Sequence, residues 1–284
     1  MVESSRTFLP VKNDAVFRLF FGDERNVEFL ESFLKSVLKL PETEYEALEI
    51  VDPHLLRESL REGALDKLAI IDVKLRTKSG NVINIEMQLD LKPDLKQRIV
   101  FYDAKLITEQ LKDGESYGNL NRVITILVTE DALFASDQRY HHRFTFYDKE
   151  AQVEFSDMIE INTLELSKLP KSKDGTLLYD WASFIAADTE ERLTMASVNS
   201  PVIQKAVLKL RELSADEETR ELYELREKAR RDEIWIREGG RKEGRQEGRQ
   251  EVAKKLLAKQ RPIDEIMDVT DLTRDEIEKL RCFN

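Results

Sequence analysis

The stretch DVKLRTKSGNVINIEMQ, residues 72–88, predicts two β-strands joined by a tight turn. Successive side chains of a strand point to opposite faces. The second arm therefore has an apolar face and a polar face, and the polar face carries Asn84, Glu86 and Gln88. On a solvated strand these residues would need no explanation. Inside a sheet they would cost free energy unless they bind something.

The turn between the arms decides which residues face each other. A three-residue loop at residues 78–80 puts Gly80 at the left-handed position that such loops require. That register pairs Asp72 with Glu86 on one face of the sheet. A two-residue loop would instead pair Asp72 with Met87 and separate the carboxylates. The position of Gly80 favours the first register.

Two carboxylates on neighbouring strands repel each other, so this face needs an explanation. One hypothesis is that solvent covers it. The other is a divalent cation, because Mg²⁺ prefers oxygen ligands, uses one or two carboxylates and keeps waters for a substrate. Metal-bound water is a nucleophile, and the metal stabilises phosphoryl oxygens. The residues alone leave both hypotheses open.

The flanking sequence predicts an α/β fold. Apolar residues recur at helical spacing in four segments, and strand-like runs occur in four others. The predicted helices are residues 14–21, 26–38, 94–112 and 176–187. The predicted strands beyond the hairpin are residues 45–51, 121–129, 143–147 and 152–161. Together these segments predict a compact α/β body.

The hairpin resembles the core of the PD-(D/E)XK nuclease superfamily, in which an Asp on one strand is followed by a hairpin and a Glu-x-Lys triplet. Asp72 matches the Asp, and residues 86–88 match the triplet with Gln88 in the lysine position. The chain also resembles the Rpn family of recombination-promoting nucleases and transposases. The segments that carry this likeness are NDAVFRLFFG, RIVFYDAKLITEQLKDGESYGNL, DWASFI and a tail of EGR-type repeats. The resemblance spans about residues 8–190 plus the tail. It implies a restriction-endonuclease-like core, which is a mixed sheet flanked by helices.

The resemblance implies that the protein is a metal-dependent DNA endonuclease. Asp72 and Glu86 would bind Mg²⁺, with Mn²⁺ as a possible substitute, and the backbone carbonyl of Met87 would help. Gln88 would orient the attacking water, which makes Asp72, Glu86 and Gln88 the expected catalytic set. The amide of Gln88 is a departure from the superfamily, because it supplies no positive charge and cannot act as a base.

Other residues then become candidates for the missing charge and for a further acid. Lys74 or Arg98 could replace the superfamily lysine. Arg98 and Tyr102 share a helical face. In nucleases of the type that the chain resembles, this helix lines the site, which implies that Arg98 could hold a phosphate. Alternatively, Tyr102 packs in the core and Arg98 pairs with Asp94 or another acid. The superfamily resemblance also implies an acid from the first helices.

Asp14 and Glu31 are the two candidates for that additional acid. Asp14 has a competing structural role, because an Asp at the start of a helix can accept hydrogen bonds from free backbone N–H groups. The sequence favours the capping role for Asp14 and does not decide the role of Glu31.

Composition limits the class of protein. The chain has 284 residues and a formal net charge of -11, so any DNA binding must come from a local basic patch or from metal ions. Cys282 is the sole cysteine, which excludes an intramolecular disulfide. No apolar run is long enough to cross a membrane, and we expect a cytoplasmic protein. His141 and His142 alternate along a predicted strand and are expected to be exposed.

The last third of the chain has a different character. We predict a nuclease-like domain at residues 1–190, a helical extension at 191–261 and a helix-turn-helix-like segment at 262–284. In GGRKEGRQEGRQEV, residues 239–252, glycines recur every four residues, and so do arginines and glutamates. Like charges at this spacing and glycines both weaken a lone helix. The extension is therefore either a homodimer interface or a solvated linker.

Two functions follow from these observations. The leading prediction is a Mg²⁺-dependent DNA endonuclease of recombination-promoting or transposase type. The alternative is a non-catalytic, dimerising interaction protein built on a degenerate nuclease fold. Metal binding and cleavage by the purified protein distinguish them.

Overall fold

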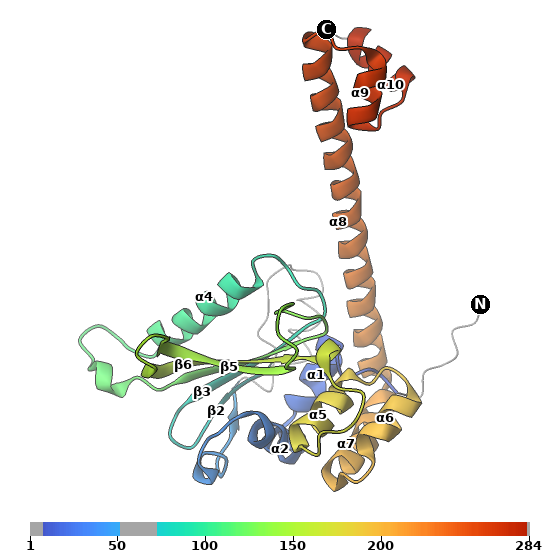
Figure 1. Ribbon diagram of the computed structural model, residues 1–284. Coiled ribbons are helices and arrows are strands. Elements are labelled where there is room, and N and C mark those ends of the chain that lie inside the picture. The colour runs from blue at the N-terminus through green and yellow to red at the C-terminus, as the bar shows by residue number, and fades with distance from the viewer. Residues whose placement is uncertain (1–7, 52–72, 283–284) are drawn as a thin grey trace. The chain divides into compact units, whose positions relative to one another are not determined.

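The computed structural model describes residues 8–51 and 73–282 (Figure 1). Its strands are β1 (Glu49–Ile50), β2 (Val73–Arg76), β3 (Val82–Gln88), β4 (Val123–Thr129), β5 (His141–Asp148) and β6 (Val153–Glu165). Its α-helices are α1 (Asp14–Phe21), α2 (Val27–Val37), α4 (Leu95–Thr108), α5 (Leu177–Ala186), α6 (Glu190–Ser197), α7 (Pro201–Ala215), α8 (Glu217–Ala258), α9 (Ile263–Thr270) and α10 (Arg274–Cys282). Short 3-10 turns are η1 (Glu24–Asn26), η2 (Glu42–Glu44), η4 (Tyr117–Asn119) and η5 (Leu166–Lys168).

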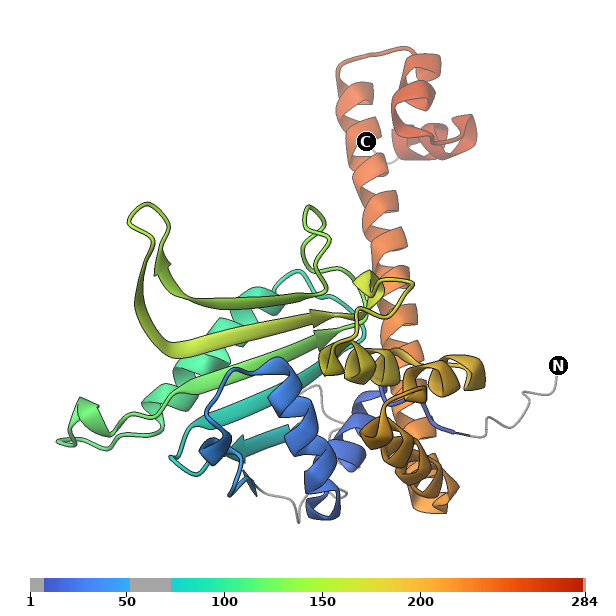
Figure 2. The same ribbon diagram turned by 60° about the horizontal axis from the view of Figure 1, so that its bottom comes forward.

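The six described strands form one mixed sheet in the order β1-β2-β3-β4-β6-β5. Strands β3, β4 and β6 run parallel to one another, and the other three pair antiparallel with their neighbours. Figure 2 shows these strands as one layer between helices. The predicted mixed sheet flanked by helices is therefore confirmed.

The β2–β3 hairpin has the register predicted from Gly80. Val73 pairs with Ile85, and the N–H of Thr77 donates to the carbonyl of Asn81 at 3.0 Å. Gly80 has a φ of +93°, the left-handed conformation expected of it. The pairing is confirmed as far as Val73. Asp72 lies outside the described residues.

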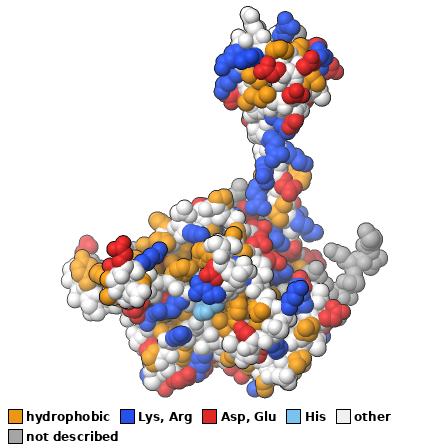
Figure 3. All heavy atoms as spheres, in the orientation of Figure 1, with side chains coloured by type: hydrophobic (Ala, Val, Ile, Leu, Met, Phe, Trp, Pro, Cys, Tyr) orange, Lys and Arg blue, Asp and Glu red, His pale blue; other side chains and the backbone are white. Residues whose placement is uncertain are grey.

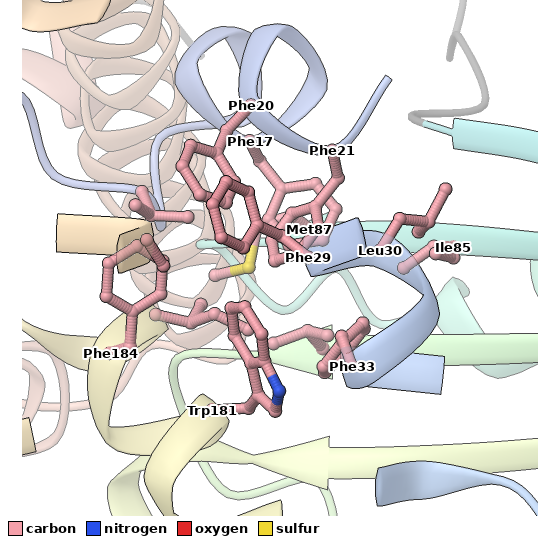
Figure 4. Packing of buried hydrophobic residues seen from close by; sticks show 14 of the residues in the cluster. Phe17, Phe20, Phe21, Phe29, Leu30, Phe33, Ile85, Met87, Trp181 and Phe184 are labelled. Atoms are coloured by element: carbon pink, nitrogen blue, oxygen red, sulfur yellow. The ribbon is translucent and has the colours of Figure 1, made fainter. Parts of the chain in front are cut away.

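One face of the sheet carries the main hydrophobic core (Figure 4). Ile85 and Met87 point from β3 toward a cluster of aromatic rings from α1, α2 and α5. The largest fully buried side chains of these helices are Phe17, Phe20, Phe21, Phe33, Trp181 and Phe184. The Nε1–H of Trp181 donates to Ser32 Oγ at 3.1 Å, so this buried polar atom is satisfied.

Helix α4 covers the opposite face of the sheet (Figure 1). Leu95 and Ile99 pack against Leu127 of β4, while Leu106 packs against Val82 of β3 and Val123 of β4. Strand β3 is consequently buried on both sides. The exposed fraction of Asn84 is 1% and that of Glu86 is 4%. The hypothesis that solvent covers this polar face is wrong.

Two local expectations also differ from the structure. Strand β1 has two residues, because residues 45–47 of the predicted strand form a turn directly after η2. His142 is 7% exposed rather than solvated, and its ring lies between the carboxylates of Glu165 at 3.2 Å and Asp137 at 3.4 Å. Alternation places His142 on the side of β5 that the chain covers, which sequence alone does not reveal.

The chain divides into two compact units, residues 1–226 and 227–284. In the first unit, Leu193 of α6 and Ile203 and Leu210 of α7 belong to the main core. In the second, α9 and α10 pack on the end of α8 around a small apolar cluster. Its buried members are Ala253, Ile266, Leu272 and Ile277. The helical character predicted for the last third of the chain is confirmed, and the predicted boundaries at 190 and 261 stay a prediction.

Replacing Gly80 by alanine is expected to destabilise the first unit. The positive φ costs about 1 kcal/mol for an L side chain, and the new Cβ would lie 3.1 Å from Asn121 Nδ2. Gly175 is the matched control, because its φ is +82° and nothing lies within 4 Å of its Cβ position. Urea unfolding should show a loss of about 2 kcal/mol for Gly80→Ala and about 1 kcal/mol for Gly175→Ala. Equal losses would show that the contact with Asn121 does not matter.

Candidate active site

Glu86 is the centre of the candidate site. Its carboxylate is buried on β3 beneath α4, and Asn84 Nδ2 donates to its Oε1 at 3.3 Å. A guanidinium nitrogen of Arg98 lies 3.9 Å from its Oε2. Burial raises the pKa of Glu86, because removing a carboxylate from water disfavours its charged form, while Asn84 and Arg98 act in the opposite direction. The site thus holds an incompletely compensated acid.

A second buried carboxylate belongs to Asp103 on α4. Its exposed fraction is 0%, and its Oδ1 accepts a hydrogen bond from Thr125 Oγ1 at 2.6 Å. Thr125 pairs with Asn84 across β4 and β3, so both side chains stand on the same face of the sheet. Burial raises the pKa of Asp103 to about 7, the Thr125 hydrogen bond opposes this, and the charge of Glu86 adds to it.

Three polar atoms at this site have no hydrogen-bond partner among the described residues. They are Asn84 Oδ1, Asp103 Oδ2 and Arg98 Nε. Buried polar atoms are rarely left unsatisfied, because each costs about 1–3 kcal/mol. Two of the three are acceptors, so the site lacks positive charge or donors. Such a place is suited to a cation or to ordered water.

The structure brings several of the predicted residues together around Glu86. Arg98 reaches the carboxylate from α4. Lys74 pairs with Asn84 across β2 and β3 and therefore stands on the same face. Gln88 is half-buried two residues beyond Glu86, at the end of β3, where it pairs with Thr129. Tyr102 is half-buried on α4 with its ring against Phe101.

The two further acids predicted from the first helices pair with basic residues elsewhere. Asp14 forms an ion pair with the guanidinium of Arg226, whose Nε lies 3.1 Å from Asp14 Oδ1. Asp14 Oδ1 also accepts from the N–H of Ala15, although the residue that caps α1 is Asn13. Glu31 lies 2.9 Å from Lys35 on the same helix. Neither contacts Glu86 in the structure.

Asp72, the predicted partner of Glu86, lies outside the described residues. Within residues 8–51 and 73–282, no group of three or more His, Cys, Asp or Glu side chains is placed to hold a metal ion. Glu86 and Asp103 are two carboxylates, and Asn84 adds an amide oxygen without a partner. Carboxylate and amide oxygens are ligands that hard divalent cations accept, so this donor set fits Mg²⁺ or Mn²⁺.

Asp103 is the site residue that sequence reasoning missed. A signal was present, because Asp103 lies four residues after Ile99 and three before Leu106, on the apolar stripe of a helix. A charged residue inside such a stripe is expected to have a partner or a function. Its neighbours could not be predicted without knowing that α4 packs over Asn84 and Thr125.

A mixed six-stranded sheet flanked by helices, with a polar and buried hairpin arm, is consistent with the fold of a PD-(D/E)XK-type nuclease. Comparison with protein families supports this class directly. Residues 11–239 match the model of the PD-(D/E)XK nuclease family transposases. The chain belongs to this family, and the resemblance inferred from its hairpin is confirmed.

Comparisons with curated proteins and with solved structures found no match. In the described part of the chain, none of the helices has both the length and the apolar character needed to cross a membrane.

The raised pKa of Asp103 predicts a pH-dependent stability. A carboxyl whose pKa is higher in the folded state keeps its proton more tightly there. Its contribution to the free energy of unfolding therefore falls as pH rises from about 4 to about 7. The rise in the pKa of Asp103 from 3.8 to about 7 corresponds to a loss of at most about 4 kcal/mol in the free energy of unfolding. Asp103→Asn removes this titration. The variant should therefore gain stability relative to wild type between pH 5 and pH 8.

Urea unfolding at both pH values, with EDTA present, measures this difference. Asp94→Asn is the control, because Asp94 is an exposed carboxylate at the start of the same helix. The interpretation fails if wild type and Asp103→Asn differ by the same amount at pH 5 and pH 8.

Proposed function

We propose that this protein is a Mg²⁺-dependent DNA endonuclease that hydrolyses phosphodiester bonds, with Mn²⁺ as an alternative cofactor. The observation that carries the proposal is the buried carboxylate of Glu86. It shares its face of β3 with the unpartnered amide oxygen of Asn84, and Arg98 of α4 lies 3.9 Å from it. Membership of a nuclease family makes phosphodiesters the natural substrate class. The recombination or transposition role is part of the same proposal.

The cation would be held by Glu86 together with Asp72 and the backbone carbonyl of Met87. When bound, a divalent cation supplies a nucleophile by lowering the pKa of its water and stabilises charge on the phosphoryl oxygens. The hairpin register supports the pairing of the two carboxylates, since Val73 already lies opposite Ile85. The oxygen-rich surroundings described above fit a hard cation.

The remaining residues would position substrate and water. Arg98 carries a fixed positive charge that can bind a phosphate oxygen through its planar fork of donors. A guanidinium nitrogen of Arg98 lies 3.9 Å from Glu86 Oε2, which is longer than a good charge-assisted hydrogen bond. The Arg98 side chain can therefore turn to a phosphate at little cost in free energy. Gln88 would orient the attacking water with its amide. Lys74, on the same face, is the second candidate for the missing lysine charge.

DNA is the proposed partner, although the chain is acidic overall. Figure 3 shows basic and acidic side chains interspersed on the face in view. A net charge of -11 gives no general affinity for phosphates, so binding should depend on the site itself and on the cation. Binding would then weaken when the metal is removed. The cytoplasmic location expected from the composition stays a prediction.

We also propose that the C-terminal helical region forms a homodimer. The glycines of the repeat support it, because apart from the helix's own backbone no described atom lies within 4 Å of a Cβ built at Gly240, Gly244 or Gly248. A second helix could approach this stripe closely. Trp235 and Ile236 on the same helix are 77% and 62% exposed, which is costly for a solvated helix.

Replacing either predicted acidic ligand should abolish cleavage. Asp72→Asn and Glu86→Gln keep the shape of each side chain and remove its charge. We expect nicking or cutting of plasmid DNA with Mg²⁺ to fall at least about 100-fold, or about 3 kcal/mol of transition-state stabilisation. The measurement is the initial rate of plasmid conversion on a gel.

Glu109→Gln is the matched control, because Glu109 is an exposed acid next to the end of α4 and pairs with Lys105. It should cleave at the wild-type rate. If wild type does not cleave with Mg²⁺ or Mn²⁺ at all, the non-catalytic interaction protein is the better description of this chain.

Bulky residues on the glycine stripe should break the homodimer. Gly244→Leu with Gly248→Leu improves helix propensity but blocks close approach, so sedimentation velocity should change from a dimer to a monomer. Lys242→Leu is the control, because Lys242 is exposed and about 200° around the helix from Gly244. A dimer that survives both glycine substitutions would refute this interface.

A further inference from the structure

The strongest unexplained feature of the structure is the position of Asp103. This acid lies at 0% exposure on α4, whose other buried residues, Leu95, Ile99 and Leu106, are all apolar. A buried carboxylate costs several kcal/mol unless its charge or its hydrogen bonds are compensated. One oxygen has a partner in Thr125 and the other has none among the described residues. Packing of α4 does not explain the second oxygen.

Protonation alone does not resolve this imbalance. A protonated carboxyl is a donor as well as an acceptor, and the free oxygen Oδ2 has no hydrogen-bond partner of either kind in the described chain. Asn84 presents the same difficulty. Its Nδ2 donates to Glu86, while its Oδ1 has no partner. The two orphaned oxygens are therefore both acceptors that need a positive or donating group.

These two oxygens belong to one neighbourhood. Thr125, which holds Asp103, is the cross-strand partner of Asn84, which holds Glu86. Neighbouring strands lie about 4.8 Å apart, so the side chains on these two residues are within reach of a common ligand. The charge of Glu86 also acts on Asp103. Two carboxylates and an amide oxygen thus converge between β3, β4 and α4.

We propose that Asp103 is a further carboxylate of the cation site, binding the divalent ion through Oδ2, and that Thr125 is the positioning residue that fixes its orientation. This inference rests on the proposed metal-dependent function and names a ligand on α4 that the hairpin motif does not contain. Asp103 completes an oxygen donor set with Glu86 and Asn84. It also couples the cation to α4, the helix that carries Arg98.

The test is Mn²⁺ binding by the full-length protein, measured from the electron paramagnetic resonance signal of free Mn²⁺. This readout does not depend on cleavage. Asp103→Asn should weaken Mn²⁺ binding at least about tenfold, as expected for loss of a ligand or its support. Asp94→Asn should bind Mn²⁺ like wild type. Circular dichroism and thermal unfolding confirm that each variant is folded.

The Thr125 variants test the same point without touching the carboxylate. Thr125→Val removes the hydrogen bond to Asp103 and should weaken Mn²⁺ binding. Thr125→Ser keeps the hydroxyl and should bind Mn²⁺ with the affinity of wild type. If Asp103→Asn does not fold, the two Thr125 variants decide the question. Equal Mn²⁺ affinity in Thr125→Val and Thr125→Ser overturns the proposal.

Two negative results have different meanings. If Asp103→Asn binds Mn²⁺ within about twofold of wild type while Glu86→Gln does not bind, Asp103 is structural and the proposal fails, but the proposed nuclease function stands. If wild type itself binds neither Mn²⁺ nor Mg²⁺, the cation-dependent function fails and the role of Asp103 fails with it.

Discussion

The burial of β3 on both faces is the constraint on which the rest of the structure depends. Its apolar face meets the aromatic core formed with α1, α2 and α5, and its polar face lies beneath α4. A strand in this position normally carries apolar residues on both sides. Asn84 and Glu86 break that rule at 1% and 4% exposure. The protein must therefore compensate a carboxylate in its interior.

The compensation inside the described chain is partial. Glu86 receives one long hydrogen bond from Asn84 and a guanidinium at 3.9 Å. Asp103 receives a short hydrogen bond from Thr125 and feels the like charge of Glu86. Elsewhere, the buried acid Glu160 is fully engaged by Arg122, Arg143 and Asn162. The contrast indicates that this sheet can satisfy a buried carboxylate, whereas the two carboxylates beneath α4 are only partly compensated within the described chain.

Much of the fold could be predicted because local signals agree with it. The hairpin register follows from one glycine, whose left-handed conformation fixes the loop length. Helices such as α2 and α5 follow from apolar spacing that matches a single buried face. The family could be recognised because its motif lies within this locally determined hairpin. These features depend on residues close together in the chain.

The features that could not be predicted depend on contacts between distant segments. Asp14 pairs with Arg226, which lies 212 residues away. Burial of His142 depends on the sheet edge and on the segment that carries Asp137 and Phe134. The role of Asp103 depends on how α4 lies across β3 and β4. Sequence periodicity shows which side of an element is covered, but it does not show which polar groups meet there.

If the proposed nuclease function holds, the same geometry accounts for a site that has Gln88 in place of the superfamily lysine. A lysine at position 88 would place a strongly hydrated ammonium at the half-buried end of β3, where desolvation lowers the pKa of an amine. In the proposed site, Arg98 would bring its charge from α4 instead, and a guanidinium keeps its proton in such surroundings. Because the charge and Asp103 both come from α4, the helix and the hairpin must meet correctly before the site is complete. In that proposal Gln88 would have a neutral task for which an amide is suited, the orientation of a water molecule by hydrogen bonds.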